Sequence, residues 1–127
     1  MPSSSDRPSH NRRAVGSRYE QQAADFLIQH GYTILDRNWQ AGHKEIDLIA
    51  QKPGVIVFVE VKAARSNAFG HPAEWVSTRK QTLLAQAAQV YLDTKKITGC
   101  DIRFDVICFV TGRLEYFPAA FDAPVEE

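Results

Sequence analysis

The sequence predicts an α/β (α+β) fold: a mixed β-sheet of about five strands flanked by helices, in the order α-β-β-β-α-β-β. Apolar residues recur at helical spacing in two separate segments, whereas alternating and β-branched runs fill the segments between and after them. The second helical segment also separates two strongly apolar runs. That order is typical of a crossover that makes the two strands parallel neighbours.

A single domain is expected over residues 14–118, because a chain of 127 residues can bury one hydrophobic core. Residues 1–13 are rich in proline, serine and arginine, so we expect a disordered basic tail. Residues 119–127 are expected to form an acidic tail. No apolar run approaches the roughly 18 residues of a membrane span, no signal peptide is expected, and the two cysteines lack metal-ligand spacing. We therefore expect a cytoplasmic protein without a membrane partner.

Residues 17–30 are predicted to form the first helix, with Ser17 as its N-cap and Gly31 as its left-handed stop. Ser17 and Glu20 also match a capping box, in which the glutamate bonds back to the N-cap amide. The apolar positions recur at helical spacing: Tyr19, Ala23, Phe26 and Leu27.

Three strands follow, over residues 32–39, 45–50 and 55–62. The second alternates cleanly between polar and apolar residues, and the third is strongly β-branched. Pro53-Gly54 is a turn signal between them, so these two strands should form an antiparallel hairpin.

After a surface loop over residues 63–76, Ser77 or Thr78 should cap a second helix that runs to about Asp93. A strand over residues 102–110 and a short partner over residues 114–117 complete the sheet. The second helix carries an apolar stripe: Leu84, Ala87, Ala88 and Tyr91.

The hairpin concentrates carboxylates. A four-residue loop over residues 51–54 would pair Ala50 with Val55 and place Glu45 opposite Glu60. Carboxylates on neighbouring strands lie about 5 to 8 Å apart and repel unless a cation separates them. A small set of oxygen ligands that leaves room for water suits Mg²⁺ or Mn²⁺ better than zinc. Asp47 is expected opposite Phe58. The residues expected on this face are Glu45 and Asp47 on the second strand and Glu60 and Lys62 on the third.

The alternative interpretation is a solvent-facing polar stripe, in which surface ion pairs contribute little. Ile56 and Phe58 share the face of Glu60, however, and acids beside buried aromatic residues require a stabilising partner. This neighbourhood favours the metal site.

These residues also resemble a known superfamily. Asp47, followed after a short hairpin by Glu60-Val61-Lys62, resembles the D…E-x-K signature of the restriction-endonuclease-like nucleases. Glu20 resembles the glutamate that archaeal Holliday-junction resolvases carry on their first helix. Four segments over about residues 14–117 resemble the small bacterial YraN-type family: Arg37-Asn38-Trp39, Glu45 to Ala50, Val57 to Lys62 and Arg103 to Val106.

The resemblance implies a nuclease-type core and nucleic-acid binding, with DNA favoured over RNA. Asp47, Glu60 and the Val61 carbonyl would hold one Mg²⁺ (or Mn²⁺), and Glu45 would be a further or water-mediated ligand. Lys62 would orient the attacking water or stabilise the charge that develops on the phosphate.

Glu20 is a further catalytic candidate, because it shares its helix face with Ala23, Ala24 and Leu27 and so points toward the core. The capping box is its alternative explanation. In the first turn of the second helix, Arg79, Lys80 and Gln81 are candidate nucleic-acid contacts. Arg103 and Asp105 share a strand face and are expected to form a structural pair.

The sequence thus predicts a Mg²⁺-dependent DNA endonuclease that acts on branched or otherwise structured DNA. A non-catalytic nucleic-acid-binding module with the same fold is the alternative. A third hypothesis is a metal-binding scaffold that recruits a protein partner through Trp75 and the long loop. The 15 basic and 15 acidic residues exclude a simple polycation. A homodimer is an expectation from the resolvase resemblance.

Overall fold

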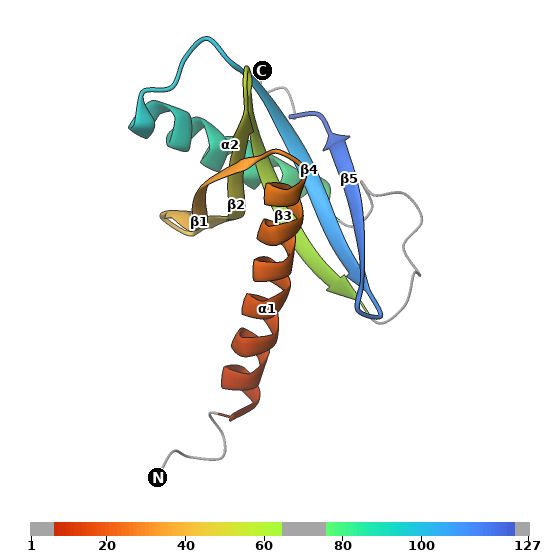
Figure 1. The fold of residues 1–127 in the computed structure, drawn as a ribbon. Coiled ribbons are helices and arrows are strands. Elements are labelled where there is room, and N and C mark those ends of the chain that lie inside the picture. The colour runs from red at the N-terminus through yellow and green to blue at the C-terminus, as the bar shows by residue number, and fades with distance from the viewer. Residues whose placement is uncertain (1–6, 65–75, 124–127) are drawn as a thin grey trace.

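The computed structural model describes residues 7–64 and 76–123, with side chains described from residue 16 onward. Over these residues the elements follow the predicted α-β-β-β-α-β-β order (Figure 1). No helix in the same ranges combines the length and apolar character of a membrane span. The elements are α1 (Arg7–Gln29), β1 (Thr33–Ala41), β2 (Lys44–Lys52), β3 (Val55–Ala64), α2 (Thr78–Lys95), β4 (Asp101–Val110) and β5 (Arg113–Phe121).

The five strands form one mixed sheet whose spatial order follows the sequence, from β1 at one edge to β5 at the other. β3 and β4, the strands on either side of α2, are parallel, and the other neighbours are antiparallel. The predicted α/β class and the crossover are therefore confirmed. The architecture is consistent with the restriction-endonuclease-like fold that the sequence motifs imply.

The two helices cover opposite faces of the sheet (Figure 1). α1 buries Ala23, Ala24 and Leu27 against one face. α2 packs its predicted stripe on the other face, where Phe58 and Phe104 lie. Alternation along the strands explains both layers, since successive side chains point to opposite faces. The buried positions of α2 are Leu84, Ala87, Ala88 and Tyr91.

Helix α1 begins at Arg7, before the predicted start at Ser17. Residues 7–13, which were expected in a disordered tail, are therefore helical. Pro8 lies in the first turn, where proline is tolerated because its missing N–H would have no helical partner. Ser17 lies inside the helix, so the predicted capping box with Glu20 does not form. This removes the alternative explanation for that glutamate.

The C-terminal strand is also longer than predicted, because β5 continues past residue 118 to Phe121. Ala119 has a φ of +51°, and its N–H donates to Asp105 Oδ1 at 2.8 Å. This irregularity interrupts the strand without ending it. Phe121 then returns to the core and stacks on Phe104, with ring centroids 5.2 Å apart.

The hairpin register differs from the prediction. Lys52 pairs with Val55, and Leu48 pairs with Val59, so the turn contains only Pro53 and Gly54. Gly54 supplies the required positive φ of +84°. The predicted four-residue loop and the pairs Glu45–Glu60 and Asp47–Phe58 are therefore wrong. The register is shifted by two residues, and an even shift keeps each side chain on its expected face within the paired part of the hairpin, Leu48–Lys52 and Val55–Val59.

Candidate metal centre

The sheet divides between β2 and β3. Their pairing ends at Leu48 and Val59, although both strands continue. Beyond that point β2 stays paired with β1, and β3 stays paired with β4. We call this opening, bounded by residues 44–47 of β2 and 60–64 of β3, the strand fork.

Asp47 lies at the start of the strand fork. Its Oδ2 accepts a hydrogen bond from the Val61 N–H at 2.8 Å. The Asp47 side chain thus takes the place of the β2 backbone, which no longer pairs with β3 at this point. The alternation of β2 breaks here. Ile46 packs on the α2 side of the sheet, whereas Leu48 packs on the α1 side. The strand fork and this break together place the Asp47 carboxylate beside β3.

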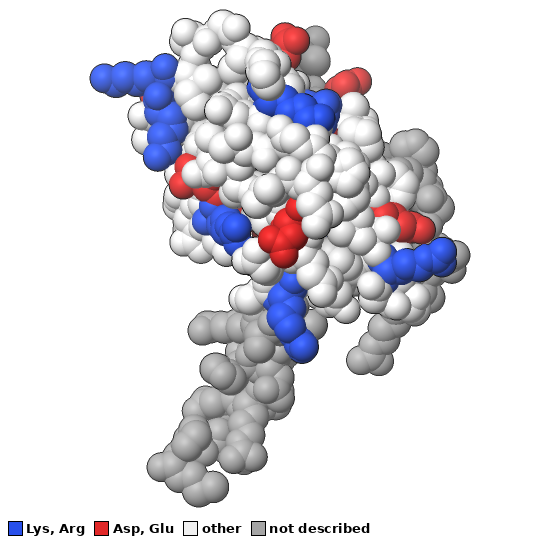
Figure 2. Space-filling view, in the orientation of Figure 1, with Lys and Arg blue, Asp and Glu red and all other residues white. Residues whose placement is uncertain are grey.

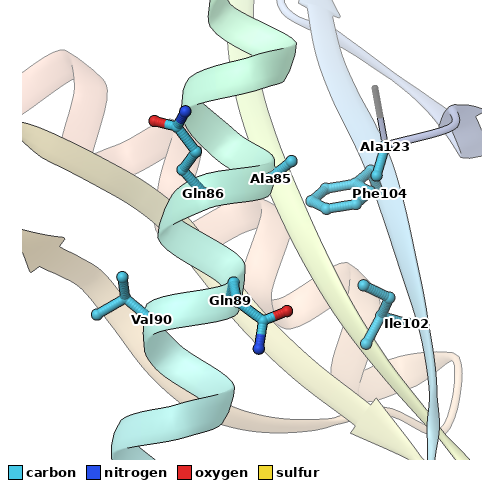
Figure 3. A pocket seen from close by; sticks show the side chains of 7 residues that line it. All are labelled: Ala85, Gln86, Gln89, Val90, Ile102, Phe104 and Ala123. Carbon is cyan, nitrogen blue, oxygen red and sulfur yellow. The ribbon is translucent and has the colours of Figure 1, made fainter. Parts of the chain in front are cut away.

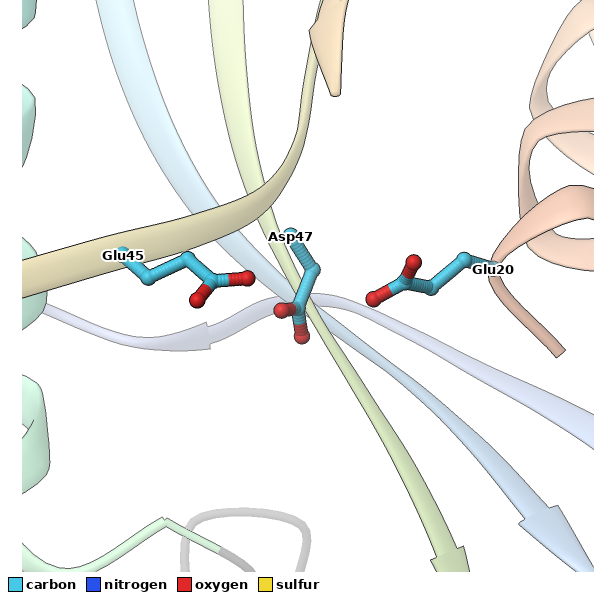
Figure 4. Close-up of side chains that lie close together, drawn as sticks. All are labelled: Glu20, Glu45 and Asp47. Atoms are coloured by element: carbon cyan, nitrogen blue, oxygen red, sulfur yellow. The ribbon is translucent and has the colours of Figure 1, made fainter. Parts of the chain in front are cut away.

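Three carboxylates meet at this point (Figure 4). Glu20 comes from α1, and Glu45 and Asp47 come from β2, with their carboxylates directed toward one another. One oxygen from each lies within 4.8 Å of the others, and all three residues are half-buried. With Val61 and Lys62, Glu20 and Asp47 line a cavity of about 180 Å³. The expected proximity of the α1 glutamate to the site is therefore observed.

Glu60 lies beside this group rather than within it. Its side chain is 5% exposed and forms ion pairs with Lys62 Nζ at 3.3 Å and Lys80 Nζ at 3.8 Å. When protonated, the Asp47 carboxyl donates a hydrogen bond to Glu60, which links Glu60 to the three carboxylates. Glu45 extends to the other side, where Gln40 of β1 donates to its Oε2 at 3.5 Å.

Burial and neighbouring acids raise the pKa values of two carboxylates at this site. The pKa of Asp47 is raised to about 8, chiefly by burial and next by the charge of Glu60, against the lowering effect of the Val61 N–H. The pKa of Glu20 is also raised, mainly by burial, although a hydrogen bond from Asn38 opposes the shift. A cation among these oxygens would stabilise all the ionised forms together.

Asn38 is a site residue that sequence reasoning missed. It adopts a φ of +49° within β1, and its side-chain amide hydrogen-bonds Glu20. Asparagine tolerates this left-handed conformation better than most residues and is depleted in strands. An asparagine inside a predicted strand therefore indicates an irregular backbone position, and this was the sequence signal that could have pointed to Asn38.

The nucleic-acid candidates of α2 have three different environments. Ser77 is the N-cap, as predicted, and its Oγ accepts the Lys80 N–H at 3.1 Å. The Lys80 side chain extends to Glu60. Arg79 is exposed to solvent. Gln81 Nε2 donates to the Val76 carbonyl at 3.0 Å, so this amide is engaged at the start of its own helix.

Arg103 and Asp105 form the expected structural pair. Arg103 Nη2 lies 2.8 Å from Asp105 Oδ2, and Nε lies 2.9 Å from Oδ1. The hydroxyls of Tyr32 and Tyr116 accept from Arg103, and Tyr116 donates to Asp105. Asp105 is fully buried, and this closed set of bonds joins β4 to β5 and to the start of β1. It is a structural network.

A wider groove of about 400 Å³ lies between α2 and β4 (Figure 3). Its lining contains no titratable side chain, so it offers no acid, base or metal ligand. Trp39 packs edge-on against Tyr91, with ring centroids 5.1 Å apart, which matches a packing role. Trp75, the basis of the scaffold hypothesis, lies outside the described residues. The groove is lined by Ala85, Gln86, Gln89, Val90, Ile102, Phe104 and Ala123.

Basic and acidic side chains are interspersed over the face seen in Figure 2, and they are not gathered into one continuous basic patch. A phosphate contact on this face would therefore depend on individual cations.

Residues 19–109 match the family model described as "Uncharacterised protein family UPF0102". A UPF0102 protein of Chloroherpeton thalassium is 41% identical over 114 residues, which cover 90% of this chain and 87% of the relative. One from Trichlorobacter lovleyi is 40% identical, covering 87% and 91% of the two chains. One from Dictyoglomus turgidum is 35% identical, covering 87% and 99%.

Proposed function

The chain belongs to the UPF0102 family, the YraN-type family of the restriction-endonuclease-like superfamily, and from this premise we propose that it is a metal-dependent DNA endonuclease. The substrate class is DNA, with branched or otherwise structured DNA tested beside linear DNA. One observation carries the proposal: three carboxylates from α1 and β2 converge within 4.8 Å beside an ion-paired Glu60 and Lys62.

The donor set fits Mg²⁺ or Mn²⁺. All the side-chain ligands are carboxylate oxygens, the type that these hard cations prefer, and no sulfur or imidazole lies among them. The raised pKa of Asp47 supports the same assignment, because it reflects a burial and charge cost that a cation would offset. Asp47, Glu60 and the Val61 carbonyl would hold the ion, with Glu20 and Glu45 as further direct or water-mediated ligands.

When bound, the divalent cation would supply Lewis-acid polarisation of the scissile phosphate and would lower the pKa of a bound water. The chain itself supplies position and charge. The Val61 amide holds the Asp47 carboxylate in the strand fork at 2.8 Å. Asn38 orients Glu20 from β1. This preorganisation reduces the rearrangement needed at the moment of reaction.

Lys62 is the residue proposed to act on the attacking water. Its ammonium lies 3.3 Å from Glu60, and 39% of its side chain is exposed, so it reaches both the acidic group and solvent. From there it would orient the water with one N–H and stabilise the negative charge that develops on the phosphate oxygens.

The test is cleavage of labelled linear, single-stranded, flapped and four-way-junction DNA in Mg²⁺, Mn²⁺ or EDTA. Wild type is compared with Glu60→Gln and Lys62→Ala, and with Glu115→Gln, which changes an exposed carboxylate of β5. We expect metal-dependent cutting by wild type and Glu115→Gln only. Equal cutting by Glu60→Gln would exclude the strand fork as the site. Binding without cutting by wild type would favour the non-catalytic nucleic-acid-binding module.

A further inference from the structure

Lys80 occupies an unfavourable position in its own helix. It lies in the first turn of α2, where the macrodipole disfavours positive charge, and that turn contains no acidic residue. Its side chain nevertheless extends to the strand fork, where Nζ lies 3.8 Å from Glu60 Oε2.

Glu60 already has a nearer cation. Lys62 Nζ lies 3.3 Å from Glu60 Oε2, the same oxygen that Lys80 approaches at 3.8 Å. One carboxylate and two ammonium groups leave this set with a net positive charge. A separation of 3.8 Å is also too long for a hydrogen bond, so the N–H donors of Lys80 are not used on Glu60.

The exposed fractions show the side from which a ligand can approach. The Glu60 side chain is 5% exposed, whereas those of Lys62 and Lys80 are 39% and 38% exposed. Both lysine side chains are therefore partly open to solvent, whereas the carboxylate that they approach is not. They come from β3 and α2 respectively, so they border this side of the strand fork from two different elements.

We propose that Lys80 is a phosphate-binding residue, whose Nζ donates to a non-bridging oxygen of the DNA phosphodiester while Lys62 serves the attacking water. This assignment rests on the proposed function, which brings a phosphate to the strand fork. It separates the two lysines by role: Lys80 binds substrate charge, and Lys62 acts at the reacting atoms. No covalent step at Lys80 is involved.

The test measures DNA affinity over a range of salt concentrations, by anisotropy of a labelled duplex and a labelled four-way junction, in EDTA and in Ca²⁺. Wild type is compared with Lys80→Ala, Lys80→Arg and a control, Lys96→Asn. Lys96 is an exposed cation at the opposite end of α2, with a φ of +56° that asparagine tolerates. We expect Lys80→Ala to reduce the slope of log affinity against log salt by about 1. Lys80→Arg should restore the slope, and Lys96→Asn should leave it unchanged.

Single-turnover cleavage in Mg²⁺ and Mn²⁺ affinity are measured on the same proteins. Cleavage by Lys80→Ala should fall by about 10²-fold. Its Mn²⁺ affinity should be equal to that of wild type or higher, because a cation near the carboxylates has been removed; this readout also shows that the site remains folded.

The outcomes separate the two proposals. If wild type cuts DNA and Lys80→Ala retains both its salt slope and its cleavage rate, Lys80 only pairs with Glu60, and the inference is overturned while the nuclease stands. If wild type binds without cutting and Lys80→Ala lowers the slope, the phosphate contact stands and the nuclease fails. If wild type binds neither the duplex nor the four-way junction, both proposals are overturned.

Discussion

Asp47 accepts the backbone N–H of Val61 at 2.8 Å, at a point where the strands that carry the two residues have ceased to pair. The carboxylate therefore has a structural task as well as a proposed chemical one. It satisfies an amide of β3 with one oxygen, and its carboxyl group also meets Glu20, Glu45 and Glu60. Burial, and next the charge of Glu60, raise the pKa of Asp47 against the lowering effect of the Val61 amide.

The stability of the metal-free protein should fall as pH rises. The pKa of Asp47 is raised from its ordinary 3.8 to about 8, so the native state holds this proton more tightly than the unfolded chain. The resulting stabilisation is complete below the ordinary pKa and is lost as pH rises through about 8. Asp47→Asn cannot titrate there and can still accept the Val61 N–H. In EDTA its melting temperature should fall less than that of wild type between about pH 5 and about pH 9.

Glu115→Gln, which removes an exposed carboxylate of β5, is the control for that experiment and should follow the wild-type pH profile. If Asp47→Asn followed the same profile as wild type, the proposed titration of Asp47 would be wrong.

Asn38 should tune metal affinity without contacting the metal. Asn38→Gly keeps a backbone that accommodates the φ of +49° but removes the amide that hydrogen-bonds Glu20. Loss of a residue that orients a metal ligand typically weakens binding 10- to 100-fold, so we expect at least about a 10-fold weaker Mn²⁺ affinity by calorimetry. An unchanged affinity would show that Glu20 does not contribute to the ion site.

The Arg103–Asp105 network should contribute to stability and not to metal binding. Asp105→Ala leaves Arg103 and Tyr116 without their carboxylate and removes the acceptor of the Ala119 amide. Loss of one partner from a buried ion pair costs about 3–5 kcal/mol, measured as a lower urea midpoint. Asp122→Ala, at an exposed acid after β5, should cost little. A similar midpoint for both variants would argue against this network.

Tyr91 should join β1 to α2 with a single hydrogen bond. Its hydroxyl donates to Asp36 Oδ2 at 2.7 Å, and its ring packs against Trp39 and Phe58. Tyr91→Phe keeps the packing and removes the bond, so we expect a loss of about 1 kcal/mol in the free energy of unfolding. Tyr91→Leu should cost more because the aromatic contacts are lost as well. Equal losses would assign the whole effect to the hydrogen bond.

The parts of the fold that depend on local pattern could be predicted from sequence. Ser77 caps α2, and the predicted stripe ending at Tyr91 is the buried face of that helix, because capping chemistry and helical periodicity are local properties. The β-branched run of β3 and its parallel partner β4 were also predictable, since a helix separates them in the chain.

The site geometry could be predicted only in part. Strand alternation predicted that Asp47 and Glu60 would lie close together, and the two-residue register shift did not change this, although the alternation of β2 breaks between Ile46 and Leu48. The strand fork could not be predicted, because the divergence of β2 from β3 depends on how both faces of the sheet pack. The contact between Lys80 and Glu60 joins α2 to β3 and has no sequence pattern.

The first measurement to make is a calorimetric titration of the protein with Mn²⁺, repeated with Mg²⁺ as competitor, because it asks whether the strand fork is a metal centre. We expect wild type to bind Mn²⁺ and Mg²⁺ to displace it. Binding should release protons below about pH 8, and Asp47→Asn should abolish it. Mn²⁺ binding of equal affinity in Asp47→Asn, or none in wild type, would contradict the assignment of a metal centre to the strand fork.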